Sequence, residues 1–493
     1  MKIYNFNIFS LSPVIFLSLI SCNPNKVGKF VASPIHFINA GFEKKSKTEL
    51  PASWKLVPTE GYAVTQVDDI KHLGGHSLKM VGTPADGSKD MNVSQKVSVD
   101  YKQVKRIRVT AYIKTEQLKG NVVLWYNIFD GKEREIDFGN SESLGVMATG
   151  TKDWQKYAID IVLGNDAKVL NFGAYMRGTG TVWFDDFAIE EYEGGSGKPS
   201  SEVVKLNTEF IDVVKKNSIY KDSIDWNAVE KDLALLGKGL KVPSDAIILN
   251  SYVLQRLRKV GDYHSFIQNK VGAQNYTSGK VTQPEPESKL LTNGIGYISV
   301  PSFGSVNEEA VEKFALQIQA MIKELDTRND IKGWVVDLRT NGGGNMYPMI
   351  SGLAPLLDTG NLAYFIKGTK DYPLKLTENG MRVNIKDPYK VKNKNNKIAV
   401  LIGSKTGSSG EMTAISFIGQ HNTKLFGEPS AGYLTSNEIF KISDGSNLVL
   451  ATSYIADRNR KKYLEKIYPD ITVKVVGNGD TVLQKAKSWL AER

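Results

Sequence analysis

A serine-rich turn follows an apolar run in the C-terminal half of this 493-residue chain. The run covers residues 398–403, and Ser404-Lys405-Thr406-Gly407-Ser408-Ser409-Gly410-Glu411 comes next, before a helix-like segment. A serine at a strand-to-helix turn is exposed, and free N–H groups at the helix start can stabilise an oxyanion. Ser408 is therefore a candidate nucleophile. Serine and glycine also cap helices without chemistry, so this turn alone does not decide a function.

A second glycine-rich turn follows the apolar run at residues 334–338. Its sequence is Arg339-Thr340-Asn341-Gly342-Gly343-Gly344-Asn345. Glycine gives the backbone conformations that other residues rarely adopt, so N–H groups of this turn can approach a substrate carbonyl closely. A phosphate-binding loop is the alternative, but the Gly-Lys-Ser/Thr ending of such loops is absent.

Together these motifs resemble a known enzyme family. Asp337-Leu338-Arg339-Thr340-Asn341-Gly342-Gly343-Gly344, the Ser408 turn and Gly427-Glu428-Pro429-Ser430-Ala431-Gly432 are similar to motifs of tail-specific (C-terminal processing) and tricorn-type serine peptidases. The similarity covers residues 202–475. It implies that Ser408 is the nucleophile and that the substrate is a polypeptide. It also implies an oxyanion hole built from the N–H groups of Ser409 and of Gly343 or Gly344.

The general base departs from the processing-peptidase pattern. In that branch a lysine directly follows the Gly-Glu-Pro-Thr-x-Gly motif, whereas Tyr433 stands here. Tyrosine, with an unperturbed pKa of about 10, is a poor base at neutral pH. The tricorn-like branch uses a histidine just before the sheet domain, and His264 has that place here. Its titration at about pH 6 to 7 would make activity rise with pH through this range. A histidine that only caps a helix is the alternative.

An acidic residue that orients the histidine is expected at Asp457, which follows a strand near the end of the domain. In a triad, such a carboxylate holds the imidazole in the required tautomer. Glu438 and Asp470 are alternatives.

The elements around these residues predict an α/β domain over residues 267–493. From residue 294 onward, apolar runs alternate with amphipathic segments, which indicates a mostly parallel sheet covered by helices. One face of the first such helix would carry Val311, Phe314, Ile318, Ile322 and Leu325. Residues 201–266 have helical periodicity and predict a small helical cap. Residues 265–293 are expected to form a loop.

The N-terminal part predicts a jelly-roll-like β-sandwich over residues 35–193, followed by a linker at 194–200. Short β-rich segments separated by turns indicate the sandwich. Asn39-Ala40-Gly41-Phe42-Glu43 and Gly180-Thr181-Val182-Trp183-Phe184-Asp185-Asp186 resemble carbohydrate-binding modules. The resemblance implies a structural calcium held by Glu43 with Asp185 or Asp186, a surface carboxylate pair being the alternative. Aromatic side chains that could stack on a glycan, or simply belong to the core, are Trp125, Tyr126 and Tyr175.

The first residues predict a lipoprotein signal peptide over 1–21 and a tether over 22–34. A short apolar stretch broken by serine and proline precedes Leu19-Ile20-Ser21-Cys22, which resembles the bacterial lipobox. Cys22 is the only cysteine of the chain, so no intrachain disulfide can form. Lipidation at Cys22 would anchor the protein in the bacterial cell envelope, facing the periplasm or the exterior. An ordinary secretory signal is the alternative.

Composition narrows the function further. The chain is 41% hydrophobic and 24% charged, as in ordinary globular proteins. Its net charge of +10 comes from scattered lysines, so no nucleic-acid partner is expected. The sequence therefore predicts an envelope serine endopeptidase that acts through an acyl-enzyme on Ser408, with His264 as base and no cofactor in catalysis. The alternative is a catalytically inactive peptide- or glycan-binding lipoprotein that keeps the peptidase fold.

Overall fold

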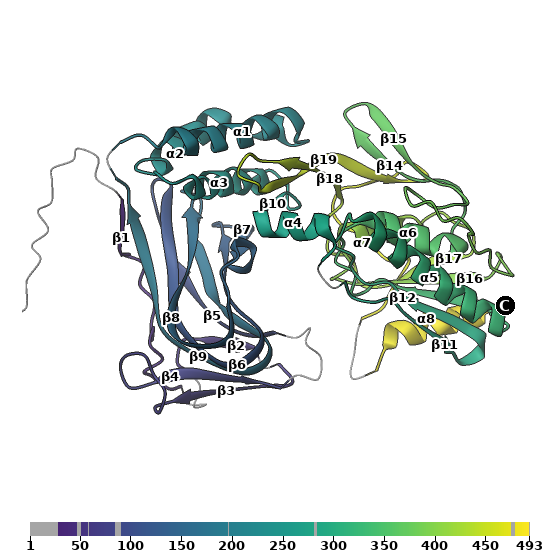
Figure 1. The fold of residues 1–493 in the computed structure, drawn as a ribbon, viewed down its shortest axis with the longest axis horizontal. Coiled ribbons are helices and arrows are strands. Elements are labelled where there is room, and N and C mark those ends of the chain that lie inside the picture. The colour runs from purple at the N-terminus through teal and green to yellow at the C-terminus, as the bar shows by residue number, and fades with distance from the viewer. Residues whose placement is uncertain are drawn as a thin grey trace, which may run out of the picture.

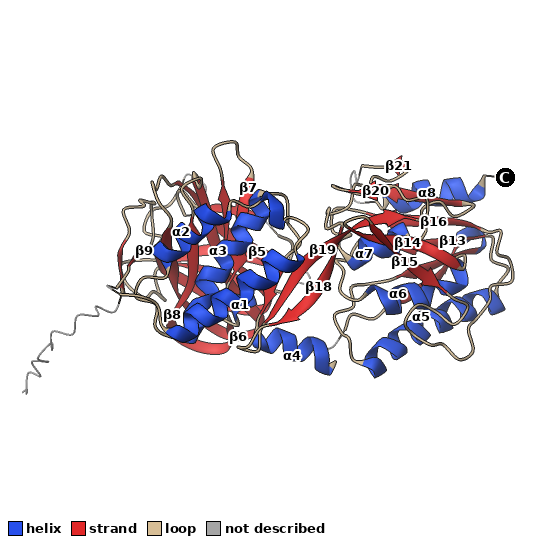
Figure 2. Ribbon diagram, turned by 90° about the horizontal axis from the view of Figure 1, so that it is seen from above, coloured by secondary structure: helices blue, strands red, loops and turns tan. Residues whose placement is uncertain are grey.

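The computed structural model describes residues 28–46, 51–57, 59–83, 90–195, 197–280, 283–474 and 479–492. The chain forms a β-sandwich, a layer of three helices and a two-sheet peptidase-like domain (Figures 1 and 2). This agrees with the multidomain class predicted from the sequence. The predicted signal peptide and Cys22 lie outside the described residues. Among the residues that are described, every helix is too short or too polar to cross a membrane.

The sandwich is wholly antiparallel, and its two longest strands, β6 and β9, pair over most of their length. Alternate β6 residues such as Ile107 and Val109 enter its core, as a half-buried strand requires. Strand β1 pairs with β9 through Lys29↔Glu193, so the sheet begins inside the segment predicted as a tether. The strands are β1 (Lys29–Ala32), β2 (Lys55–Val57), β3 (Tyr62–Val67), β4 (Ser77–Gly82), β5 (Asp90–Ser98), β6 (Lys105–Phe129), β7 (Glu135–Asn140), β8 (Ala148–Leu163) and β9 (Val169–Glu193).

The predicted helical cap consists of α1 (Ser201–Asn217), α2 (Trp226–Leu236) and α3 (Ala246–Lys259). The side chains of Ser200 and Asp225 accept N–H groups in the first turns of α1 and α2, which fixes where these helices begin. Apolar side chains of the three helices form one core with Val162 of the sandwich and Leu448 of the peptidase-like domain. The cap therefore packs against both the sandwich and the peptidase-like domain and connects them.

The parallel sheet that was predicted is present, and α8 packs on one side of it while α5, α6 and α7 pack on the other (Figure 1). Only β11 runs antiparallel to its neighbour. Its strands, in spatial order, are β11 (Glu287–Leu291), β12 (Ile295–Ser299), β13 (Gly333–Asp337), β16 (Lys397–Ile402), β17 (Thr423–Gly427) and β21 (Ile471–Thr472). The helices are α5 (Glu308–Arg328), α6 (Met346–Leu353), α7 (Ser409–Ile415) and α8 (Thr481–Ala491).

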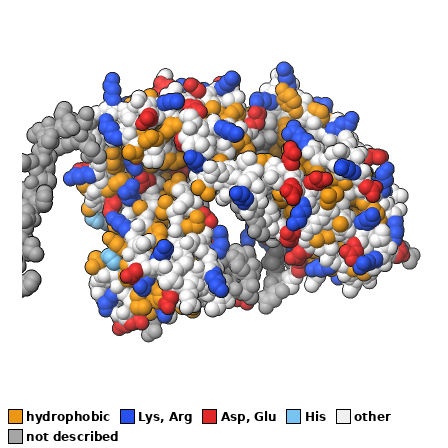
Figure 3. All heavy atoms as spheres, viewed as in Figure 1, with side chains coloured by type: hydrophobic (Ala, Val, Ile, Leu, Met, Phe, Trp, Pro, Cys, Tyr) orange, Lys and Arg blue, Asp and Glu red, His pale blue; other side chains and the backbone are white. Residues whose placement is uncertain are grey.

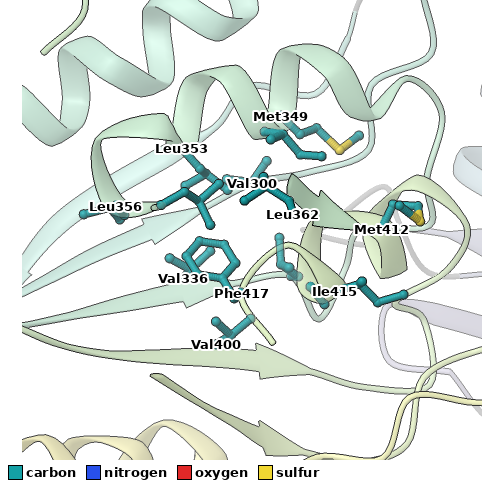
Figure 4. Packing of buried hydrophobic residues seen from close by; sticks show 14 of the residues in the cluster. Val300, Val336, Met349, Leu353, Leu356, Leu362, Val400, Met412, Ile415 and Phe417 are labelled. Carbon is teal, nitrogen blue, oxygen red and sulfur yellow. The ribbon is translucent and has the colours of Figure 1, made fainter. Parts of the chain in front are cut away.

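The two strands that lead into the glycine-rich turns, β13 and β16, are packed in the hydrophobic core of the peptidase-like domain. Val336 of β13 and Val400 of β16 pair in register, and both contact an apolar layer that includes Met412 and Phe417 (Figure 4). All four side chains are almost fully buried. The turn after each strand therefore starts from a rigid base.

A second, antiparallel sheet was not predicted. Its order is β10-β19-β14-β15, with β18 and β20 also paired to β19, and the β18–β19 hairpin reaches across to α1 (Figure 2). Residues 265–293, expected to be a loop, contribute β10, α4 and β11. The bounds are β10 (Phe266–Gln268), α4 (Lys270–Ser278), β14 (Gly360–Lys367), β15 (Lys370–Leu376), β18 (Thr435–Lys441), β19 (Asn447–Asp457) and β20 (Lys462–Tyr463).

Candidate active site

The two glycine-rich turns meet at one edge of the parallel sheet. β13 and β16 are neighbouring parallel strands, so their carboxyl ends lie side by side. The N–H of Gly407 donates to the carbonyl of Asn341 at 2.9 Å, which joins the two turns. A Cβ on Gly343 would lie only 2.7 Å from the Cβ of Ser408, so that position accepts only glycine.

Ser408 is held in a strained backbone conformation. Its φ is +51° and its ψ is −118°, a region that residues with a side chain rarely adopt. Such strain costs about 1 to 3 kcal/mol and persists only where surrounding contacts enforce it. Here the enforcing contact is the carboxylate of Glu411, which accepts the N–H of Ser408 at 2.7 Å.

Glu411 also connects this turn to the loop that follows β17. Its carboxylate accepts the hydroxyl of Ser430 and the N–H groups of Gly432, at 2.8 Å, and Tyr433, at 2.9 Å. The side chain is fully buried, and burial raises its pKa despite these hydrogen bonds. One carboxylate thus fixes both the turn that carries Ser408 and the segment that leads into β18.

His264 lies beside Ser408, although the two residues are far apart in sequence. Its Nε2 is 2.9 Å from the Ser408 Oγ, and its Nδ1 is 2.9 Å from the hydroxyl of Thr435. The Thr435 hydroxyl is 3.5 Å from the Asn437 Oδ1, to which it can donate while accepting the Nδ1–H. This arrangement favours the tautomer in which Nε2 is free to accept the Ser408 proton.

The backbone around His264 is fixed from both sides. Asp262, at the end of the cap, accepts the N–H groups of His264 and Ser265, at 3.1 and 2.9 Å. From β18, the side-chain amide of Asn437 donates to the carbonyl of His264 at 2.8 Å. Burial lowers the pKa of the half-buried imidazole to about 4, so it is neutral at pH 7.

Asp457 is not the partner of His264, which corrects the sequence prediction. Its buried carboxylate accepts the N–H groups of Asn459 and Lys461 and the hydroxyl of Tyr463, and so closes the turn after β19. The two alternatives are also occupied elsewhere: Glu438 binds Lys367 and Thr452, and Asp470 accepts the N–H of Leu425. The hydroxyl of Thr435 has the position expected for a carboxylate.

The predicted oxyanion donors differ in their availability. The N–H of Gly343 donates to the side chain of Asn341 at 3.0 Å and is therefore occupied. Within the described part of the chain, the N–H groups of Gly344 and Ser409 have no acceptor. Gly344, with φ +115°, packs so closely on the carbonyl of Phe303 that a Cβ would lie 2.1 Å from it.

A cavity of about 560 Å³ opens at Ser408 and His264. Tyr433, which stands where the processing peptidases have lysine, lines it, and its ring lies against that of His264 with centroids 5.5 Å apart. Burial raises the pKa of Tyr433, which makes it a still weaker base than a free tyrosine. Tyr433 is therefore a wall of the site, and His264 is the side chain placed to accept a proton.

Comparison with known proteins identifies the family. Residues 294–473 match the model of peptidase family S41. The nisin-resistance protein of Lactococcus lactis subsp. lactis is 30% identical over 273 residues, which cover 53% of this chain and 82% of that protein. The chain belongs to peptidase family S41. The site residues Ser408 and Thr435 lie inside the segment matched by the family model, whereas His264 precedes it.

Two further similarities agree with this S41 assignment. Carboxyl-terminal-processing peptidase 2 of Arabidopsis thaliana is 26% identical over 170 residues, which cover 34% of this chain and 29% of that protein. A solved lipoprotein structure from Streptococcus agalactiae is 29% identical, with a TM-score of 0.50, and the match covers 59% of this chain and 96% of that one. The S41 domain is thus a member of a serine peptidase family, joined here to a β-sandwich.

The carboxylates predicted to hold calcium come together in the sandwich of this S41 protein. A Cβ placed on Gly41 would lie 3.3 to 3.6 Å from one oxygen each of Asp185, Asp186 and Glu43. Burial and the charge of Asp186 raise the pKa of Asp185 to about 6. However, the backbone N–H and the ring of His72 already bind Asp185 and Asp186, and the described residues contain no group of three ligands arranged for a metal. A calcium ion would have to displace these contacts.

The three aromatic residues predicted to contact sugars differ in exposure. Tyr126 is buried in the sandwich core, and its hydroxyl donates to Asp137 at 3.2 Å, so it cannot stack on a ligand. Trp125 and Tyr175 are half-buried and lie on the opposite face of the sheet. Strand β9, which carries Tyr175, places Gly173 opposite Trp125, and Gly173 packs closely against the carbonyl of Val93 on β5.

Proposed function

We propose that this S41 protein is a serine endopeptidase that cleaves polypeptides through an acyl-enzyme on Ser408. The observation that supports this best is the 2.9 Å contact between the Ser408 hydroxyl and the Nε2 of a neutral His264, whose Nδ1 faces Thr435. A nucleophile, a base within hydrogen-bond reach and a third group that orients the base are the parts that acyl transfer needs.

In the proposed reaction, the Ser408 Oγ attacks the substrate carbonyl carbon while its proton passes to the His264 Nε2. The N–H groups of Gly344 and Ser409 bind the resulting oxyanion. The intermediate collapses as the C–N bond breaks and His264 returns the proton to the leaving amine. Water then attacks the acyl ester with His264 as base, which releases the new carboxyl end and restores Ser408.

A fluorophosphonate probe tests the proposal directly, because only an activated serine reacts readily with it. We expect the purified protein to be labelled at Ser408, and Ser408→Ala to be unlabelled. Ser404→Ala, which removes an exposed serine hydroxyl of the same turn and keeps Ser408, is the matched control and should be labelled like the wild type. Absence of labelling, with peptide binding retained, would instead favour the catalytically inactive, peptide-binding alternative. The name of the Lactococcus relative makes nisin one polypeptide to include among the substrates tested.

Lipid anchoring in the envelope is part of the same proposal. Cys22 follows a lipobox-like segment, and the solved structure at TM-score 0.50 is described as a lipoprotein. Metabolic labelling with a lipid precursor should mark the wild-type protein but not Cys22→Ala, because the chain has no other cysteine. Equal incorporation by the two proteins would leave an ordinary secretory signal as the better explanation.

Glycan binding by the sandwich is a second candidate function. Beside Trp125 and Tyr175, the side-chain oxygens of Asn92 and Asn171 and the indole N–H of Trp125 are buried without a hydrogen-bond partner in the described residues. Buried polar atoms of this kind commonly await a ligand or water. Binding to a panel of cell-wall glycans should weaken at least about tenfold in Trp125→Ala, because an aromatic ring supplies much of the contact with a sugar.

Structural calcium remains a proposal for the carboxylates around Gly41. If calcium binds there, it should raise the Tm of the sandwich, and Glu43→Gln should abolish the increase. Glu116→Gln changes an exposed carboxylate elsewhere in the sandwich and is the control. An identical Tm with calcium and with a chelator would show that His72, His76 and the backbone N–H groups satisfy these carboxylates without a metal.

A further inference from the structure

Among the described residues of the sandwich, only strand β7 contributes to the wall of the proposed active site. Phe138, near the middle of β7, lines the same cavity as Ser408 and His264. It also lines a second cavity, of about 540 Å³, on the other side of His264 and Tyr433. The segment matched by the S41 family model begins more than 150 residues after Phe138, so this wall comes from outside the peptidase domain.

Strand register determines which way Phe138 faces. β7 pairs with β6, and Phe138 is opposite Asn127, while its neighbour Asp137 is opposite Ile128. Ile128 is fully buried in the sandwich core, so the adjacent pair must lie on the other face of the sheet. Phe138 is therefore not needed to fill the sandwich core. Its ring instead faces the junction with the peptidase domain.

A buried ion pair holds β7 against the helix that leads to His264. Arg258 of α3 binds Asp137, and both side chains are less than a tenth exposed. The Arg258 guanidinium also lies over the Phe138 ring, 4.5 Å from its centroid. Gln255, one turn earlier on α3, donates to Asp137 at 3.3 Å and to a sandwich carbonyl at 2.9 Å. The position of β7 is thus fixed relative to the catalytic histidine.

Further polar contacts make the junction rigid. Asp166, in the turn between β8 and β9, binds Arg256 and Lys259 of α3, and Arg106 of β6 lies 3.8 Å from Asp245. Below the cavity, Asn269 at the start of α4 donates to the carbonyl of Ser143 at 2.6 Å. The contacts of Asp166 and Arg106 bind the helical cap to the sandwich, and the Asn269–Ser143 contact runs between the two lobes visible in Figure 3.

The cavity wall has a clear chemical character. The described residues that line it include no aspartate, glutamate or lysine, and the one permanent cation among them, Arg258, is neutralised by Asp137. Half of the residues that line it are aromatic or aliphatic. Besides Phe138, they include Tyr263, Phe266, Met346, Phe365 and Ile439. Such a wall favours an uncharged, bulky apolar group and disfavours a charged one, which would lose its hydration without gaining a partner.

We propose that Phe138 is a specificity-determining residue, through which the sandwich selects polypeptides with a bulky apolar residue next to the cleaved bond. This inference rests on the proposed peptidase function, since it names the substrate class of the same site. In this arrangement the sandwich supplies one wall of the substrate pocket, and it does so whether or not Trp125 and Tyr175, which lie on the same face of the sheet as Phe138, bind a glycan.

The test compares two series of blocked alanine peptides that carry Phe, Leu, Ala or Glu immediately before or after the central bond. Only one of the two series places its variable residue against Phe138. In that series, Phe138→Ala should lower kcat/KM for the Phe and Leu peptides by about 10- to 100-fold, because pocket contacts of this size discriminate by that factor. The Ala peptide should change by less than about threefold. Phe138→Leu should retain part of the preference. Labelling of Ser408 by a small fluorophosphonate should proceed at the wild-type rate.

The matched control is Phe129→Ala. Phe129 lies on the neighbouring strand β6 and, like Phe138, is half-buried, but it lines neither of the two cavities. It should leave the peptide preference unchanged. An equal loss for all four peptides in Phe138→Ala, or the same loss in Phe129→Ala, would show that the aromatic ring only supports the fold and would overturn the inference.

A binding measurement separates this inference from the peptidase proposal. In the Ser408→Ala background, calorimetry with the same peptides measures the pocket without any chemistry. The Phe peptide should bind at least about tenfold more weakly once Phe138→Ala is added. A wild-type protein that hydrolyses nothing but keeps this Phe138-dependent binding would refute the peptidase and leave the pocket assignment standing. Hydrolysis that does not depend on Phe138 would support the peptidase and refute the pocket assignment.

Discussion

The hydroxyl of Thr435 lies 2.9 Å from the Nδ1 of His264, where a Ser-His-Asp triad has its carboxylate. A hydroxyl can fix the tautomer and the ring orientation as a carboxylate does, but it carries no charge to stabilise the imidazolium. In the proposed mechanism Thr435 is thus a positioning residue. Its contribution to the rate should be smaller than that of a triad aspartate.

Replacement of Thr435 tests this role. Thr435→Val keeps the shape and removes the hydroxyl, so kcat should fall about 10- to 100-fold with little change in KM, as for other groups that orient a functional histidine. Thr435→Ser keeps the hydroxyl and should retain most of the activity. Steady-state kinetics with one peptide substrate make the comparison. Full activity in Thr435→Val would show that Nδ1 needs no partner.

The pH dependence of the reaction follows from the burial of His264. Burial lowers its pKa to about 4, and only the neutral imidazole can accept the Ser408 proton. kcat/KM should therefore rise with pH through about 4 and reach a plateau below about 6, not in the range from 6 to 7 expected from an ordinary histidine. A substrate without titratable groups gives the cleanest profile. If the rise in kcat/KM is instead centred at about pH 6.5, His264 has the pKa of a solvated imidazole, and water reaches the ring freely.

The lowered pKa of His264 should also make the free energy of unfolding depend on pH. Between about pH 4 and 6.5, the unfolded chain binds a proton at this position and the folded protein does not. The free energy of unfolding should therefore decrease as the pH falls through this window. His264→Asn should remove this part of the pH dependence, whereas His421→Asn, on an exposed turn, should not.

Glu411 gives a prediction about the nucleophile turn. Glu411→Gln replaces one acceptor oxygen by an N–H₂ group that faces backbone N–H donors, so at least one buried donor loses its partner. We expect the free energy of unfolding to fall by about 1 to 3 kcal/mol, as for other buried donors left unpaired. The fluorophosphonate labelling rate should also fall, because Ser408 loses the contact that holds its positive φ. Glu324→Gln, on the exposed face of α5, is the control. Wild-type stability in Glu411→Gln would show that the turn keeps its conformation without the full set of carboxylate hydrogen bonds.

Sequence patterns were sufficient for part of this site. Ser408 could be placed because a fully buried strand and a helix flank its turn within a few residues, and the parallel sheet could be predicted from the same buried runs. Thr435 could not be placed, because its strand β18 is mostly polar and only partly buried and gives no alternating signal. Asp457 was chosen as an acidic residue after a strand, but the bonds that occupy it are visible only in the folded turn.

The sequence also did not predict that the sandwich would line the cavity through Phe138. β7 holds six residues and contains Phe138 without any motif around it. Its place in the wall of the cavity that Ser408 also lines depends on the pairing of β7 with β6 and on the contact between Asp137 and Arg258, residues separated by 121 positions. Long-range contacts between two domains leave no local pattern in one sequence. β10 is similar, since its three residues form a strand only because β19 is there to pair with them.

The ion pair between Asp137 and Arg258 should be among the most sensitive contacts of the molecule. Asp137→Leu leaves a buried guanidinium without its partner, which typically costs about 3 to 5 kcal/mol of stability. The double variant Asp137→Leu/Arg258→Met removes both charges and should recover most of this loss. Chemical denaturation of the two single variants and the double variant completes the cycle.

The exposed pair Glu324–Arg328 on α5 is the control for this cycle, and its coupling should be only about 0.3 to 0.5 kcal/mol. Loss of the buried pair should also affect the active site, because Arg258 lies six residues before His264 and β7 carries Phe138. We therefore expect the double variant to be folded but to have lost the preference for apolar peptides. If stability returns and the preference is unchanged, β7 keeps its place through Gln255 and the Asp166 contacts alone.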